Sequence, residues 1–151
     1  MPLIRARRWH SVWAALAGRH VYLDSNVFIA HREAGGATGS ALQGLFALFE
    51  QGIVLASTSE LALAEVLVLP LAARDFARSN DYRALLEPGG VVAIIPVSRK
   101  VLEDAAALAA ETRMALPDSI HVATAMQAGC DVFVSNDRGV VLPSQMQLRR
   151  F

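Results

Sequence analysis

The chain has 151 residues, enough for one domain with a substantial core, and 54% of them are hydrophobic. This composition excludes a disordered or fibrous protein, and the single cysteine, Cys130, excludes an intramolecular disulfide and a cysteine-based zinc site. The 14 basic and 14 acidic residues give a formal net charge of zero. If several of the acids surround metal ions, the remaining surface is net basic and suits a polyanionic partner.

No segment has the pattern of a membrane span or of a secretory signal. The longest apolar run, Leu61 to Ala73, is interrupted by Glu65 and Pro70 and is too short to cross a bilayer. A lone cysteine also fits a reducing compartment. We therefore expect a soluble, cytoplasmic protein with no membrane association.

Residues 1–20 form a segment with arginines, two tryptophans and no acid. We interpret it as a basic N-terminal extension that precedes a domain spanning residues 21–151. A basic amphipathic helix that touches RNA or a partner remains an alternative, and the segment also faintly resembles a transit peptide.

From residue 21 onward, short apolar runs alternate with helical patterns. The pattern predicts strands at 21–23, 53–56, 91–97, just before Asn136, and at 147–151, with helices after Asp24, at 40–51, after Ser59, at 74–86, at 98–114 and from Leu116. Pro70 is expected to kink or stop its helix. Such alternation predicts a three-layer α/β/α sandwich with a central, mainly parallel sheet whose carboxyl ends share one edge.

Four acids stand at positions that need an explanation. Asp24 and Asp137 follow strands, Asp118 opens a helix, and Glu65 is the only charge in a long apolar helix. Taken singly, each has an ordinary explanation as a helix cap, a dipole partner, a turn former or a water-facing helix edge. Asp118 and Asp137 can meet only if the helix between them lies along or across the carboxyl edge of the sheet. One shared meeting place explains all four acids better than four separate accidents.

A cluster of carboxylates without histidine or cysteine ligands selects Mg²⁺ or Mn²⁺ rather than zinc. Unscreened carboxylates a few ångströms apart repel one another, and a bound cation turns that repulsion into affinity. Such an ion can activate water and bridge a phosphate, which is the chemistry of phosphodiester hydrolysis.

Four sequence stretches resemble the acidic motifs of PIN-domain ribonucleases, above all the VapC-type toxins of bacterial toxin–antitoxin pairs. They are VYLDSNVFIA, ASTSELALAEVL, LPDSIHVATA and VFVSNDRG, in the family's order and at approximately its separations. The resemblance covers about residues 21–146. It implies an α/β/α sandwich, an endoribonuclease dependent on Mg²⁺ or Mn²⁺, a homodimer, and a small antitoxin that blocks the site.

The resemblance assigns metal binding and catalysis to the four acids. It implies that Asp24, Glu65 and Asp118 position the metal, and that Asp137 binds a second ion or orients the attacking water. The products it implies carry a 5′-phosphate and a 3′-hydroxyl.

Four further residues receive weaker assignments. Asn26 and Ser135 match the polar positions that would hold Asp24 in place, although the family often has threonine where this chain has Ser135. Arg138 is a candidate for binding a flanking phosphate, with a solvated turn residue as the simpler interpretation. His121 could face the cleft, but we favour a structural histidine.

Three other functions remain open. A catalytically idle PIN-like module could use the acidic pocket only to dock a basic partner segment. A haloacid-dehalogenase-type phosphatase fits less well, because that chemistry needs a second aspartate where this chain has Asn26, and a lysine for which only Lys100 is present. A DNA nuclease is also possible, since the metal chemistry does not require a 2′-hydroxyl.

Overall fold

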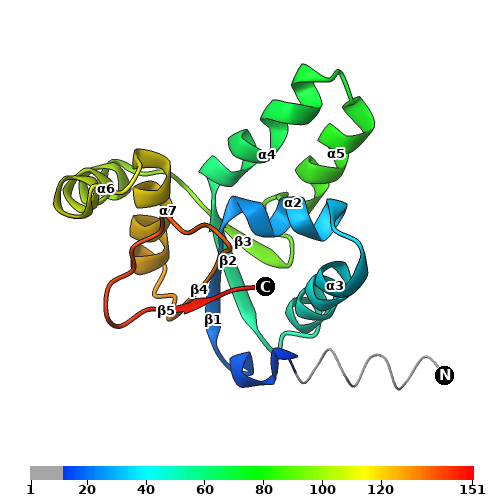
Figure 1. Cartoon of the computed structure of the whole chain (residues 1–151), viewed down its shortest axis with the longest axis horizontal. Coiled ribbons are helices and arrows are strands. Elements are labelled where there is room, and N and C mark those ends of the chain that lie inside the picture. Colours follow the sequence, from blue (N-terminus) through cyan, green and yellow to red (C-terminus); the bar gives the residue numbers. More distant parts are fainter. Residues whose placement is uncertain (1–11) are drawn as a thin grey trace.

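The computed structural model describes residues 12–151, so the arginines at positions 5, 7 and 8 of the expected extension lie outside the described residues. Its centre is a five-stranded sheet in which all neighbours are parallel, in the order β3-β2-β1-β4-β5 (Figure 1). The strands are β1 (His20–Leu23), β2 (Leu55–Ser59), β3 (Val92–Ile95), β4 (Val132–Val134) and β5 (Gln147–Arg149).

Helices cover both faces of this sheet. α2 (Ser25–Glu33), α3 (Gly36–Glu50), α4 (Glu60–Ala72) and α5 (Phe76–Leu85) lie on one side, and α6 (Arg99–Thr112) and α7 (Leu116–Gln127) lie on the other (Figure 1). A short 3₁₀ helix, η1 (Ala14–Leu16), precedes β1. The predicted three-layer α/β/α sandwich with a parallel sheet is therefore confirmed.

Side chains on the two faces of β1 pack into two separate hydrophobic cores. Val21 and Leu23 are fully buried in the large core shared with α2–α5. Tyr22 points to the opposite face, where it packs with Phe133 and Val122. This is the alternation that a strand buried on both sides requires.

Polar caps decide where the helices start. The side chains of Asp24, Ser59, Asp75 and Ser98 each accept a hydrogen bond from a backbone amide in the first turn of α2, α4, α5 and α6 respectively. Because such caps satisfy amides that have no partner within the helix, each one fixes a helix start beside the strand or loop before it.

The second strand begins two residues later than predicted. The Ile53 and Val54 amides both donate to the Leu48 carbonyl and so close the end of α3 instead of entering the sheet. Of the two residues predicted to cap the next helix, Thr58 and Ser59, Ser59 is the N-cap of α4, and both also pair with β3. Pro70 lies in the last turn of α4, which continues to Ala72 rather than stopping at the proline.

Residues just before β1 pack against the domain. The Trp13 side chain is 1% exposed, and its Nε1–H donates to the Ala41 carbonyl at 2.8 Å. Leu16 is buried in the same core, and the Arg149 guanidinium lies 5.5 Å from the Trp13 ring centroid. Trp13 and Leu16, which make these contacts, precede residue 21, the expected start of the domain. That domain boundary stays a prediction.

Replacing Trp13 with alanine should lower the free energy of unfolding by about 3–5 kcal/mol, because it empties a closed site in the main core. Urea unfolding measures the change. Val12→Ala is the matched control, because Val12 is 41% exposed and its truncation should cost less than about 0.5 kcal/mol. Equal effects of the two substitutions would show that residues 12–20 are not part of the folded unit.

Candidate active site

Asp24 lies at the carboxyl end of the central strand, where β1 passes into α2. Its side chain is buried, with 4% of the residue exposed, and Oδ1 accepts a hydrogen bond from the Ser25 amide at 2.8 Å. The capping role considered from the sequence is therefore real. It leaves most of the acceptor capacity of the carboxylate for other partners.

A polar network ties Asp24 to the end of the adjacent strand β4. The Ser135 hydroxyl donates to Asp24 Oδ2 at 2.7 Å and accepts from the Asp137 amide at 3.0 Å. Asn26 Nδ2 lies 3.1 Å from Ser135 Oγ and 3.4 Å from Asp24 Oδ2. Asn26 Oδ1 is buried and has no hydrogen-bond partner among residues 12–151. Asn26 and Ser135 thus both contact Asp24, and their role in holding a metal ligand stays a prediction.

Asp118 and Asp137 come together over Gly139. The Asp137 carboxylate accepts from the Gly139 amide at 2.8 Å. A Cβ atom on residue 139 would lie 3.3 Å from Asp137 Oδ1 and 3.5 Å from Asp118 Oδ2. The first turn of α7 therefore lies at the carboxyl edge of the sheet, and a side chain at position 139 would crowd the space that the two acids border.

Glu65 reaches the site through His121. His121 is 1% exposed, and its Nε2 hydrogen-bonds Glu65 Oε1 and lies 3.7 Å from Asp24 Oδ1. On the other side of the ring, Nδ1 lies 2.6 Å from the hydroxyl of buried Tyr22. His121 is structural in the sense that it is buried and partnered, but its partners belong to the acidic site.

Tyr22 is the site residue that sequence reasoning missed. The available signal was its place one residue from Leu23 and two from Asp24, on the sheet face opposite Val21 and Leu23. That alternation put a hydroxyl on the α7 side of the sheet, where His121 also lies.

The acids are close enough to act on one another. The pKa of Asp118 is raised to about 6, first by burial and then by the negative charges of Asp137 and Asp24, with a smaller contribution from Glu65 and an opposing one from His121. Because Asp118 is in the first turn of α7, the helix dipole by itself would favour its charged form. Burial and repulsion outweigh the dipole, so the site gains from a cation.

The donor set fits a hard divalent cation. Within residues 12–151, no three histidine, cysteine or acidic side chains form a ready-made cage for an ion. Instead, Asp24 and Glu65 both approach Nε2 of His121, and Asp118 and Asp137 both border Gly139. Mg²⁺ does not need an all-protein cage, because it usually keeps several waters and takes one or two carboxylates.

Arg138 follows Asp137 in the chain and lines an exposed pocket of about 550 Å³, together with Asn136, Arg150 and Phe151. The Asn136 amide group holds residue 151 through two backbone hydrogen bonds, of 2.9 and 3.0 Å. Two guanidinium groups therefore border a polar pocket next to Asp137.

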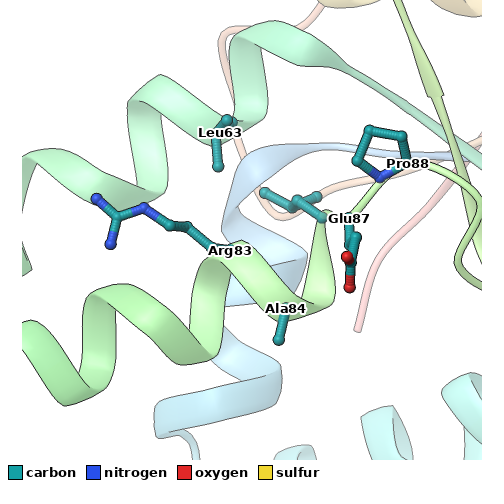
Figure 2. Close-up of a pocket in the computed structure, with 6 residues that line it drawn as sticks. Leu63, Arg83, Ala84, Glu87 and Pro88 are labelled. Atoms are coloured by element: carbon teal, nitrogen blue, oxygen red, sulfur yellow. The ribbon is translucent and has the colours of Figure 1, made fainter.

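A second pocket, of about 330 Å³, lies between α4 and α5 and contains none of the four acids (Figure 2). Its lining is mixed: Leu63, Ala84, Leu86 and Pro88 with Arg83 and Glu87. It is separate from the acidic site and offers no comparable cluster of titratable groups.

Two other expectations concern residues outside the acidic site. Cys130 is a buried core residue, and burial raises the pKa of its thiol to about 12, which leaves it unreactive. In the part of the chain that the structure describes, no helix is both long enough and apolar enough to cross a bilayer.

Together, the fold and the site define a parallel α/β/α protein with acids from four chain segments gathered at the carboxyl edge of its sheet. The sequence model of the PIN domain matches residues 21–141, and the chain therefore belongs to the PIN domain family. This confirms the family that the four motifs indicated.

Solved structures of the same fold cover most of the chain. A toxin–antitoxin complex from Klebsiella pneumoniae has 22% identity over 84% of this chain and 98% of its own, with a TM-score of 0.57. VapBC2 from Rickettsia felis, bound to a promoter DNA fragment, has 14% identity, coverages of 87% and 98%, and a TM-score of 0.65.

VapC20 from Mycobacterium tuberculosis, a toxin that cleaves the sarcin–ricin loop, has 19% identity, coverages of 78% and 90%, and a TM-score of 0.63. At these identities the likeness shows a shared fold. Comparison with curated protein sequences finds no match.

Proposed function

We propose that the protein is a metal-dependent endoribonuclease and the VapC-type toxin of a toxin–antitoxin pair. The observation that carries the proposal is the convergence of Asp24, Glu65, Asp118 and Asp137 at one edge of a PIN fold, where burial and the charges of the other acids raise the pKa of Asp118. Four carboxylates this close together repel one another, and a bound cation would offset that repulsion.

In this proposal Asp24, Glu65 and Asp118 hold the Mg²⁺ or Mn²⁺, and Asp137 holds a second ion or orients the attacking water. When bound, the cation supplies an activated water and neutralises charge on the phosphate. Asn26 and Ser135 keep Asp24 in one orientation through their hydrogen bonds to it. The protein's own contribution is thus to hold the ligand oxygens rigidly at the open edge of the sheet.

The substrate in this proposal is RNA, cleaved at a phosphodiester bond to leave a 5′-phosphate and a 3′-hydroxyl. Arg138 is the candidate for holding a phosphate next to the cleaved bond. Its support is position: it follows Asp137 directly and shares an exposed pocket with Arg150. A guanidinium suits phosphate because it donates two parallel hydrogen bonds.

The partners in this proposal are a small antitoxin and a second copy of the chain. The solved structures from Klebsiella and Rickettsia are toxin–antitoxin complexes, which supports an antitoxin partner. On the α4–α5 arm, Val68, Leu69 and Phe76 are each more than 60% exposed, and such apolar surface commonly marks a protein interface.

Cleavage of bulk RNA by the purified chain tests the proposal. We expect cleavage with Mn²⁺ or Mg²⁺, none with a chelator, and 5′-phosphates at the new ends. Parallel reactions with single-stranded DNA and with a small phosphate ester discriminate the DNA nuclease and the phosphatase. Hydrolysis of the ester without RNA cleavage would contradict the nuclease assignment.

One observation favours a second candidate, the idle binding module. The described acids form no ready-made cage for an ion, which favours a site that serves only to dock a basic segment of a partner. Calorimetric titration with Mn²⁺ separates the two functions. Saturable binding supports the nuclease, and its absence together with tight binding of an arginine-rich peptide supports the docking module.

Removal of the Ser135 hydroxyl should weaken the metal site without unfolding the protein. Ser135→Ala leaves Asp24 Oδ2, the Asp137 amide and Asn26 each short of one partner. We expect a loss of Mn²⁺ affinity of about 10–100-fold, the range typical of residues that orient metal ligands. Ser135→Thr keeps the hydroxyl and is the control. Equal Mn²⁺ affinity in the alanine and threonine variants would contradict this role.

A further inference from the structure

A buried chain of hydrogen bonds enters the acidic site from the core and ends on Glu65. It runs from the Tyr22 hydroxyl to His121 Nδ1, at 2.6 Å, and from His121 Nε2 to Glu65 Oε1. Tyr22 comes from β1, His121 from α7 and Glu65 from α4, so the chain of bonds connects three elements. Neither Tyr22 nor His121 has a role in the proposed chemistry so far.

The direction of these hydrogen bonds follows from Glu65, the acceptor at the end of the chain of bonds. An ionised carboxylate only accepts, so Nε2 of His121 must carry a proton to bond Glu65. In a neutral ring Nδ1 is then an acceptor and needs a donor, which the Tyr22 hydroxyl supplies.

The Tyr22 ring is held firmly. It is fully buried, stacks on Phe133 with ring centroids 5.0 Å apart, and meets the His121 ring edge-on at 5.8 Å. Tyr22 therefore fixes the orientation of the His121 ring and, together with Glu65, favours its Nε2–H tautomer.

The Glu65 side chain, in contrast to the Tyr22 ring, is not fixed by burial. Its side chain is 32% exposed, whereas that of Asp24 is 5% exposed, so solvent offers Glu65 other orientations. The Nε2–H of His121 points at Glu65 and lies 3.7 Å from Asp24 Oδ1. One donor thus stands between two acids that would otherwise repel each other.

We propose that Tyr22 and His121 act as positioning residues that aim Glu65 at the metal site beside Asp24. The inference rests on the proposed function, because it concerns a cation that Glu65 helps to hold. With Oε1 held by His121, the second carboxylate oxygen of Glu65 is left to face the ion. Histidine acts here as a donor to a ligand and not as a ligand.

Titration of the full-length protein with Mn²⁺, with the free ion counted by electron paramagnetic resonance, tests this inference. Tyr22→Phe and His121→Leu should each weaken Mn²⁺ binding by about 10–100-fold, as expected for residues that orient a metal ligand. His121→Gln, whose amide can replace the Nε2–H donor, should recover part of the loss. Because Tyr22 acts through His121, the double variant Tyr22→Phe/His121→Leu should bind no more weakly than His121→Leu alone.

Tyr82→Phe is the matched control. Tyr82 is another buried tyrosine, and its hydroxyl donates to the Glu33 carboxylate at 2.8 Å, outside the acidic site. It should lower the melting temperature about as much as Tyr22→Phe and leave Mn²⁺ affinity unchanged. If Tyr22→Phe and His121→Leu also lower only the melting temperature, the two residues are merely structural and the inference is wrong.

Nitrogen-15 NMR of the histidine rings gives a readout that does not depend on metal or activity. We expect the Nε2–H tautomer of His121 in the unaltered protein and a mixture of tautomers in Tyr22→Phe. A doubly protonated ring, or an unchanged tautomer in the variant, would overturn the role of Tyr22. Failure of the unaltered protein both to bind Mn²⁺ and to cleave RNA would instead overturn the proposed function.

Discussion

Asp24→Asn is expected to abolish RNA cleavage while the protein stays folded. Asparagine caps a helix as well as aspartate does, so its carbonyl oxygen keeps the bond from the Ser25 amide and α2 keeps its start. Its amide nitrogen cannot accept from the Ser135 hydroxyl, so that one hydrogen bond is lost. What disappears is the negative charge at the centre of the acid cluster. Because residues that merely orient a metal ligand are worth 10–100-fold, loss of a ligand itself should lower the cleavage rate by at least about 100-fold.

The measurement is the initial rate of RNA cleavage at saturating Mn²⁺, with growth of cells that express the variant as a second readout. Asp75→Asn is the matched control, because Asp75 caps α5 by accepting from the Arg78 amide but lies outside the acid cluster. It should cleave RNA at the rate of the unaltered protein. Growth inhibition that survives Asp24→Asn would favour the idle binding module over the enzyme.

Asp118→Asn is expected to stabilise the metal-free protein at neutral pH. The pKa of Asp118 in the folded protein is about 6, above its ordinary value of 3.8. The folded state therefore holds this proton more tightly than the unfolded state does, and ionising Asp118 costs stability. The cost is absent below the unfolded pKa and complete above the folded one.

The gap in melting temperature between the variant and the unaltered protein should thus be small near pH 4 and widen up to about pH 7. Thermal unfolding in a chelating buffer measures it. Glu60→Gln is the control: Glu60 is also an acid in the first turn of a helix, but it faces no acid cluster, so its loss should slightly destabilise α4. If Asp118→Asn melted at a lower temperature than the unaltered protein at pH 7, ionised Asp118 would not destabilise the fold and the prediction would be wrong.

With metal bound, the unaltered protein should have a higher melting temperature than Asp118→Asn. A cation at 100 times its dissociation constant stabilises the folded state by about 2.7 kcal/mol, and Asp118→Asn should gain less than the unaltered protein. The pKa of Asp118 has a second consequence, since protons compete with the cation below about pH 6. We expect Mn²⁺ affinity of the unaltered protein to fall as the pH drops through that value, and less so in Asp118→Asn.

Much of this architecture could be predicted from local pattern. The alternation of short apolar runs with helical periods predicted the parallel sheet, and Ser98 and Asp24 marked helix starts that the structure contains. Boundaries were less predictable where a residue had two possible partners. Ile53 and Val54 have the composition of a strand, but their amides bond to the Leu48 carbonyl, so β2 starts at Leu55.

The sequence by itself determined which acids are candidate ligands of the site, and that assignment stays a prediction. Asp24, Glu65, Asp118 and Asp137 were identifiable because a charge in an apolar run, or at the end of a strand, is costly unless it has a use. Their identities indicate the class of ion, because carboxylate oxygens favour hard cations such as Mg²⁺ and Mn²⁺.

Only the tertiary structure decided how these residues are held. Tyr22 and His121 are 99 positions apart, and no local pattern links a strand tyrosine to a helix histidine. The packing of α7 over β1 brings them together, and the packing of α4 places Glu65 on the free nitrogen of the ring. Local spacing sets which face of an element a side chain occupies, but contact between faces depends on how whole elements pack.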